Sequence, residues 1–240
     1  MDSQTEPHNK LGAMGSSRRQ LLIGTAVVVV LAAGGAGAYL LKPAGTILPK
    51  SGAAAADQPN LADLMKPSPL GEETLGDPKA PITVIEYASM TCPHCAHFSA
   101  TTFPELKKRY IDTGKVYYIF REFPLDELAE AGSMVARCAG NDKYFPLVET
   151  LFAQQRDWVV QKPYQPLLAI AKQAGMTEDS FDACLANQDL SKGIEQVRSD
   201  ASTKFGVQST PTFFVNGKLV SGDISIDDMA KEFAPYLKDS

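Results

Sequence analysis

Histidine and cysteine are scarce in this chain of 240 residues, which has three histidines and four cysteines. A structural zinc site needs two pairs of closely spaced ligands, whereas only Cys92 and Cys95 form such a pair. Covalent haem attachment needs a histidine directly after the second cysteine, where this chain has Ala96. We therefore expect no cofactor. A metal site, which would have to include His94 or His97, is the weaker alternative.

The chain also lacks an excess of positive charge. It has 23 lysines and arginines against 28 aspartates and glutamates, which gives a formal net charge of −5. This balance argues against nucleic acid as a partner. With 44% apolar and 21% charged residues, the composition is that of an ordinary globular protein that can bury a full core.

The first forty residues differ in composition from the rest. Arg18 and Arg19 precede an uncharged run over residues 21–41 that is rich in valine, alanine and glycine. Such a run after a cationic start is typical of an export signal, and Ser-Arg-Arg-x-Leu-Leu resembles the twin-arginine type. We therefore predict that residues 1–41 are a cytoplasmic start followed by a signal or anchor segment, and that the folded part lies in the periplasm.

The sequence leaves open whether this segment is cleaved. Residues 21–41 reach about 30 Å as a helix, just enough to span a bilayer and anchor a periplasm-facing protein in the inner membrane. Residues 34–38 and, less typically, 54–56 offer small residues for cleavage. An uncleaved segment would be the protein's membrane contact. Residues 42–75, which begin rich in proline, glycine and alanine, are predicted to be a flexible tether.

Cys92-Pro93-His94-Cys95 is the most informative stretch, because two cysteines at this spacing can cycle between a dithiol and a disulfide. It follows the apolar run over residues 82–88, where a strand is expected to pass into a helix. Proline is favoured at the first helical position. Cys92 would then lie at the helix N-terminus, where unpaired N–H groups and the helix dipole stabilise a thiolate. A protonated His94 adds a positive neighbour, which makes the disulfide a better oxidant.

From about residue 76 the pattern is that of an α/β protein. Residues 82–88 and 116–120 are predicted strands, the first buried on both faces. The helix from Pro93 joins them into a right-handed βαβ unit, and Pro104 is expected to kink that helix.

The second half of the chain is first helical and then returns to strands. Residues 125–205 show apolar spacing of three and four, with a helix start at Thr177. Residues 212–215 have strand character and precede Asn216-Gly217, a strong hairpin signal. A second strand and a last helix follow. The order is therefore βαβ, a helical block, then ββα.

Motifs in this order resemble the DsbA-like disulfide oxidoreductases, which have a thioredoxin fold with an inserted helical domain. The resemblance covers residues 75–236 and rests on residues 92–95, on 209–213 before the hairpin, and on 103–108 with 114–116. It implies an α/β, thioredoxin-like domain over residues 76–124 and 206–240. The all-helical insertion would be residues 125–205.

The resemblance also implies roles for individual residues. Cys92, the more exposed cysteine in the family, would attack substrates, and Cys95 would be the resolving thiol. Thr210-Pro211 corresponds to the family's cis-proline, which lies beside the cysteine pair and would turn the Thr210 backbone toward a bound peptide. The alternative is an ordinary trans proline before an edge strand.

Glu86 lies inside an otherwise apolar strand, six residues before Cys92. One interpretation is a solvent-facing carboxylate on an edge strand. The other is a partly buried carboxylate near Cys95, with its pKa raised by desolvation, that relays protons during exchange. The family has an acidic residue at the matching position.

Cys138 and Cys184 fall on two predicted helices of the insertion, on faces that both point inward. In an oxidising compartment the first expectation is a structural disulfide. Two buried free thiols are the alternative. As a hypothesis, the bridge also tunes the redox properties of Cys92 and Cys95.

The function predicted from these features is a thiol:disulfide interchange enzyme that oxidises cysteine pairs in exported, unfolded polypeptides. The family implies reoxidation by a membrane-bound partner of the DsbB kind. One alternative is an isomerase or reductase kept in the reduced state, although residues 42–75 are too short for the dimerisation domain that isomerases commonly add. The other is a metal- or peptide-binding module with incidental thiols.

Overall fold

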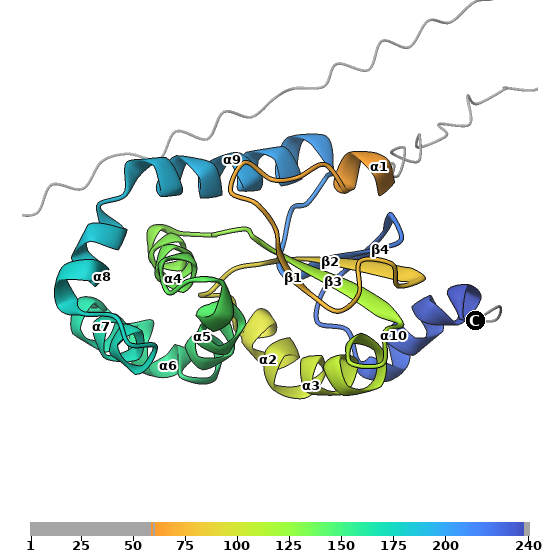
Figure 1. Cartoon of the computed structure of the whole chain (residues 1–240), viewed down its shortest axis with the longest axis horizontal. Coiled ribbons are helices and arrows are strands. Elements are labelled where there is room, and N and C mark those ends of the chain that lie inside the picture. Colours follow the sequence, from red (N-terminus) through yellow and green to blue (C-terminus); the bar gives the residue numbers. More distant parts are fainter. Residues whose placement is uncertain (1–58, 60, 238–240) are drawn as a thin grey trace, which may run out of the picture. The chain divides into compact units, whose positions relative to one another are not determined.

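A computed structural model describes residue 59 and residues 61–237 (Figure 1). The predicted export segment over residues 1–41 and the two candidate cleavage sites lie outside these positions, so export, cleavage and anchoring stay predictions. Within the described part of the chain, no helix is long and apolar enough to cross a bilayer.

Five strands of the described residues form one mixed sheet in the order β1-β3-β2-β4-β5. They are β1 (Glu73–Leu75), β2 (Ile82–Ala88), β3 (Val116–Glu122), β4 (Thr212–Val215) and β5 (Lys218–Ser221). The central strands β2 and β3 are parallel, and every other pair is antiparallel. β2 has a neighbour on each side and is buried along nearly its whole length, which accounts for its apolar sequence. The predicted βαβ unit and C-terminal hairpin are confirmed.

Helices cover both faces of this sheet (Figure 1). One face carries α2 (Pro93–Thr101), α3 (Phe103–Leu106), the π-helical η1 (Lys107–Ile111), α10 (Ile226–Phe233) and the 3₁₀ turn η2 (Ala234–Tyr236). The break between α2 and α3 lies next to Pro104, whose ring nitrogen carries no proton for a helical hydrogen bond. The helix is thus interrupted close to Pro104, where the sequence predicts a kink.

The predicted helical block contains six helices within the described residues. They are α4 (Glu127–Cys138), α5 (Asn141–Ala153), α6 (Gln155–Trp158), α7 (Tyr164–Gln173), α8 (Glu178–Leu185) and α9 (Gln188–Lys204). The start of α8 at Thr177 is confirmed: its side chain accepts a hydrogen bond from the Ser180 N–H in a reciprocal capping box. α9 runs back over the second face of the sheet, where Val197 and Ala201 join a buried cluster with Phe214.

The prediction of a flexible tether over residues 42–75 is wrong for its last part. Residues 61–75 contain the short helix α1 (Leu61–Leu64) and the edge strand β1, which pairs antiparallel with β3. Arg121 fixes this segment: its guanidinium donates to the Leu64 carbonyl at 2.7 Å and to both carboxylate oxygens of Glu72 at 2.8 and 3.1 Å. The order of this segment therefore depends on tertiary contacts, which its composition does not reveal.

The hairpin turn is a conformation that few residues adopt. Asn216 and Gly217 both have positive φ, at 47° and 89°, as the turn between β4 and β5 requires. The Asn216 side chain also ties the turn to β2, since its Oδ1 accepts from the Thr83 N–H at 2.8 Å. This contact fixes β4 beside β2, so the residues just before β4 lie near the end of β2.

Candidate active site

Cys92 lies at the N-terminus of α2, where the sequence predicts it. Its backbone is extended, and Pro93 occupies the first helical position. The thiol is 6% exposed, and Sγ donates to the Thr210 carbonyl at 3.2 Å. The Thr210-Pro211 peptide bond is cis, which confirms the predicted geometry and excludes the trans alternative. The site therefore joins the start of α2 to the segment that precedes β4.

The surroundings of Cys92 stabilise its thiolate. Its pKa is lowered to about 5, chiefly by a hydrogen bond from the Cys95 thiol, while burial acts in the opposite direction. The Thr210 side chain and the backbone N–H groups of Cys95 and His94 lower the pKa further. The buried Thr210 hydroxyl has no hydrogen-bond partner among the described residues, so it is available to donate to the Cys92 thiolate. Cys92 is therefore a thiolate at neutral pH.

Cys95, one turn into α2, is the opposite case. It is fully buried, and burial raises the pKa of its thiol well above the usual value. The hydrogen bond with Cys92 and the nearby charge of Glu86 raise it further. Cys95 therefore keeps its proton when Cys92 is ionised.

Glu86 lies on the central strand β2 with 2% of its surface exposed, so the interpretation as a solvent-facing edge carboxylate is wrong. The Tyr118 hydroxyl donates a hydrogen bond to its Oε2. Burial raises the pKa of this carboxyl to about 8. The hydrogen bond from Tyr118 lowers the pKa, and the negative charge of Cys92 raises it further. Glu86 is thus protonated near neutral pH and coupled to both thiols.

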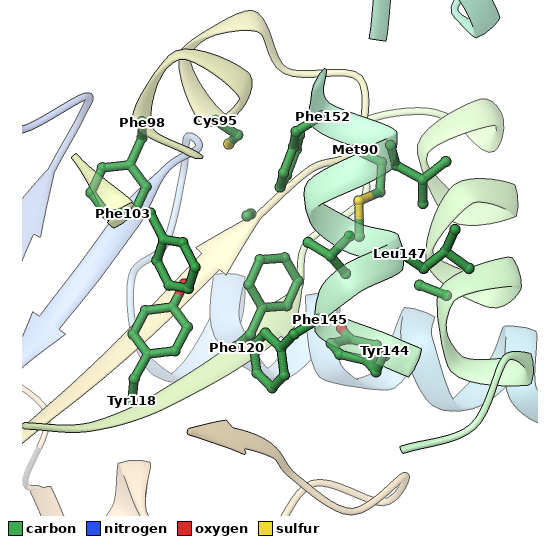
Figure 2. Packing of buried hydrophobic residues seen from close by; sticks show 14 of the residues in the cluster. Met90, Cys95, Phe98, Phe103, Tyr118, Phe120, Tyr144, Phe145, Leu147 and Phe152 are labelled. Atoms are coloured by element: carbon green, nitrogen blue, oxygen red, sulfur yellow. The ribbon is translucent and has the colours of Figure 1, made fainter. Parts of the chain in front are cut away.

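Aromatic side chains keep bulk water from this carboxyl. Figure 2 shows Cys95 at the edge of a cluster in which Phe98, Phe103 and Tyr118 follow one another below α2. A cavity of about 20 Å³ remains beside Glu86, with Tyr118 and Glu149 also in its wall. A cavity of this size can hold a single water molecule.

The two remaining candidates of the motif lie at the surface. Pro93 and His94 are both exposed, and His94 contributes to the Cys92 thiolate through its backbone N–H. An effect of its ring charge stays a prediction. His97 is exposed as well, and its Nδ1 lies 2.5 Å from the Asp223 carboxylate.

Cys138 and Cys184 form a disulfide with their Cα atoms 6.1 Å apart, so the predicted bridge is confirmed. The expectation that both face inward is wrong for Cys138, which is exposed, whereas Cys184 is 4% exposed. The reason is position: Cys138 is the last residue of α4, just past the buried stretch that ends at Ala136.

Sequence reasoning did not identify two contacts of the site. Tyr118 lies on β3 opposite Val84 in the parallel register, so its side chain is on the same face of the sheet as Glu86; strand parity could have indicated this. Gln155, on the short helix α6, hydrogen-bonds to the backbone around Cys92, and no sequence signal marks it. Within the described residues, no group of three or more histidine, cysteine, aspartate or glutamate side chains could hold a metal ion.

Two thiols with very different pKa values lie at the N-terminus of a helix, next to a cis-proline. Together with a sheet that is covered by helices on both faces, this site defines the thioredoxin-fold class of thiol–disulfide proteins. The family model described as Thioredoxin matches residues 70–232. The crystal structure of Wolbachia pipientis alpha-DsbA1 has a TM-score of 0.67 at 33% identity and covers 72% of this chain and 94% of its own. The chain belongs to the thioredoxin family, as a member of its DsbA-like branch of disulfide oxidoreductases.

Curated relatives agree with this assignment. A putative protein-disulfide oxidoreductase of Rickettsia bellii is 38% identical over 150 residues, which are 60% of this chain and 56% of that protein. The disulfide bond formation protein D of Bacillus subtilis is 29% identical over 188 residues, which are 76% of this chain and 84% of that protein. The chain thus matches only about half of the length of the Rickettsia relative.

Proposed function

We propose that this protein oxidises pairs of cysteines in exported, unfolded polypeptides and that Cys92 and Cys95 carry the exchanged disulfide. The observation that supports this most directly is the contrast between the two thiols. The pKa of Cys92 is lowered to about 5, whereas that of Cys95 is raised. A stabilised thiolate favours the reduced form of the protein, so its disulfide is a strong oxidant.

The first step is the attack of a substrate thiolate on the Sγ of Cys92. A mixed disulfide forms between substrate and Cys92, the Cys92–Cys95 bond breaks, and its electron pair goes to the Cys95 sulfur. Because the pKa of Cys95 is raised, this sulfur takes up a proton as it leaves. Glu86 is protonated near neutral pH and coupled to Cys95, so we assign it as the residue that relays this proton.

In the second step another substrate thiolate attacks the substrate sulfur of the mixed disulfide. The substrate disulfide forms, and Cys92 leaves as a thiolate, for which its low pKa makes it suitable. The two electrons from the substrate are now held by the Cys92–Cys95 dithiol. An external oxidant must remove them, and the family suggests a membrane-bound partner of the DsbB kind for this role.

The peptide segment of the substrate would bind beside Thr210 and Pro211. This segment adjoins Cys92, as the contact between Sγ and the Thr210 carbonyl shows. Backbone groups near the cis-proline could pair with an extended substrate chain without reading its side chains. Such binding suits a protein with many unfolded substrates on the periplasmic side of the membrane.

The test is stoichiometric oxidation of a reduced, unfolded protein that contains one pair of cysteines. The oxidised wild type should transfer its disulfide rapidly, and Cys92→Ser should transfer none. The control is the double variant Cys138→Ser/Cys184→Ser, which keeps the proposed centre and should still oxidise. Rapid reduction of substrate disulfides by the wild type with little oxidation would instead identify a reductase. Stoichiometric zinc binding without thiol exchange would identify a binding module.

A further inference from the structure

One side chain of the helical insertion contacts the backbone at two points next to Cys92. The amide nitrogen of Gln155, on α6, donates to the Met90 carbonyl at 2.9 Å and to the Cys92 carbonyl at 3.1 Å. An amide nitrogen has two protons, so both are used on this one segment. Met90 and Cys92 themselves belong to the loop between β2 and α2.

This loop sets the position of the Cys92 sulfur. The Cys92 carbonyl that Gln155 contacts also accepts the first hydrogen bond of α2, from the Ala96 N–H at 3.1 Å. The Cys92 N–H donates to the Ser89 carbonyl at 3.1 Å. Because both peptide groups of Cys92 are fixed in this way, the thiol is held toward the N–H groups of the first turn of α2.

Gln155 is itself held by the core. Trp158, in the same short helix, is fully buried, and its indole N–H donates to the Leu151 carbonyl at 2.8 Å. The indole ring packs so closely on Gly132 of α4 that a Cβ there would lie 2.9 Å from it and 3.2 Å from the Met90 side chain. The packing of α4 and α6 thus fixes where the Gln155 amide can reach.

We propose that Gln155 is a positioning residue for Cys92: by holding the Met90 and Cys92 carbonyls, it keeps the thiolate at the N-terminus of α2. The oxidising strength of the pair then depends on the helical insertion as well as on the thioredoxin-like part. This proposal rests on the proposed function for its biological meaning, but its physical content concerns the Cys92 thiolate alone.

A purely structural role of Gln155 would give different experimental results. If Gln155 only anchors α6, its loss lowers the melting temperature and leaves the ionisation of Cys92 unchanged. If it positions Cys92, its loss moves the sulfur relative to the N–H groups, and the thiolate becomes less stable. The midpoint of thiolate formation is therefore the quantity that separates the two roles.

The experiment compares Gln155→Leu and Gln155→Met with Gln154→Leu in the reduced full-length protein. Gln154 is the matched control, because its amide contacts Gln173 at 3.4 Å and not the loop. Gln155→Met keeps the length of the side chain and adds no charge, so it tests the idea even if Gln155→Leu folds poorly. Thiolate formation at Cys92 is followed by ultraviolet absorbance against pH, and the melting temperature is recorded in parallel.

Both Gln155 variants should raise the midpoint by about half a unit or more, which reduces the thiolate population below the midpoint roughly threefold. The two variants should shift the midpoint alike, because neither side chain can donate to the two carbonyls and neither adds a charge near the thiolate. Gln154→Leu should match the wild type. Unchanged midpoints in both Gln155 variants would overturn the proposal.

The two proposals fail separately. If the wild type oxidises substrates but the Gln155 variants keep the wild-type midpoint, the positioning role is wrong and the proposed function stands. If the midpoint shifts as expected but the wild type transfers no disulfide, the positioning role stands and the proposed function is wrong.

Discussion

Replacement of Glu86 by glutamine should remove a pH dependence of stability that the wild type carries. The folded carboxyl has a pKa of about 8, against 4.5 for the unperturbed group. Because the folded-state pKa is the higher one, the folded protein keeps a proton that the unfolded chain loses between these two values. Stability contributed by this group is therefore fully present below pH 4.5 and falls as the pH rises toward 8.

The magnitude follows from the size of the shift. Within this window the free energy of unfolding decreases by up to about 1.4 kcal/mol per pH unit, or about 2–3 kcal/mol between pH 5 and pH 7. Glu86 is 2% exposed, so solvent does not screen this effect. A glutamine has nearly the same shape, can accept the hydrogen bond from Tyr118 and does not titrate.

The assay is urea unfolding of the wild type and Glu86→Gln, both in the disulfide form, at several pH values from 5 to 8. The disulfide form is chosen because Cys92 and Cys95 then do not titrate, and burial, the largest cause of the Glu86 shift, is still present. The advantage of Glu86→Gln over the wild type should grow steadily with pH. A difference in free energy that stays constant with pH would show that the Glu86 carboxyl has the same pKa in the folded and the unfolded protein.

Three further predictions concern the cysteines and His94. Cys138→Ser/Cys184→Ser should lose about 3–4 kcal/mol of stability in denaturant unfolding, because the bridge joins residues that are 46 positions apart in the sequence; an unchanged redox potential of Cys92–Cys95 in this variant would contradict the tuning hypothesis. His94→Leu keeps the backbone N–H but loses the imidazole ring, so its reduction potential should be more negative than that of the wild type, and an equal potential would show that the ring has no such effect. Cys95→Ser in which Cys92 carries a disulfide to glutathione should exchange this glutathione, which leaves as a thiolate, for a substrate thiol and accumulate a mixed disulfide between substrate and Cys92, visible by mass spectrometry; no such adduct would argue against Cys92 as the cysteine that bonds to the substrate.

Local signals predicted the elements that carry the site. The apolar run of β2, the proline after Cys92 and the Asn216-Gly217 turn each determine local structure through their own chemistry, and the structure has a strand, a helix N-terminus and a hairpin there. The juxtaposition of Thr210 with Cys92 came from the family resemblance, since residues so far apart in the chain are brought together only by the fold.

Features that depend on tertiary packing were not predicted. The order of β1 depends on pairing with β3 and on Arg121, and neither is encoded in the composition of residues 61–75. The exposure of Cys138 depends on where α4 ends, and helix ends are less certain than helix faces. The hydrogen bond from Gln155 to the Cys92 carbonyl joins residues that are far apart in the sequence, so no local pattern indicates it.

The reduction potential of Cys92–Cys95, measured by equilibration with glutathione at neutral pH, distinguishes an oxidase from a reductase. We predict a strongly oxidising centre, because the stable Cys92 thiolate favours the reduced form. Its potential should lie well above that of thioredoxin and approach that of DsbA, which is about −120 mV. A potential near about −270 mV, as in the reductant thioredoxin, would contradict the oxidase assignment.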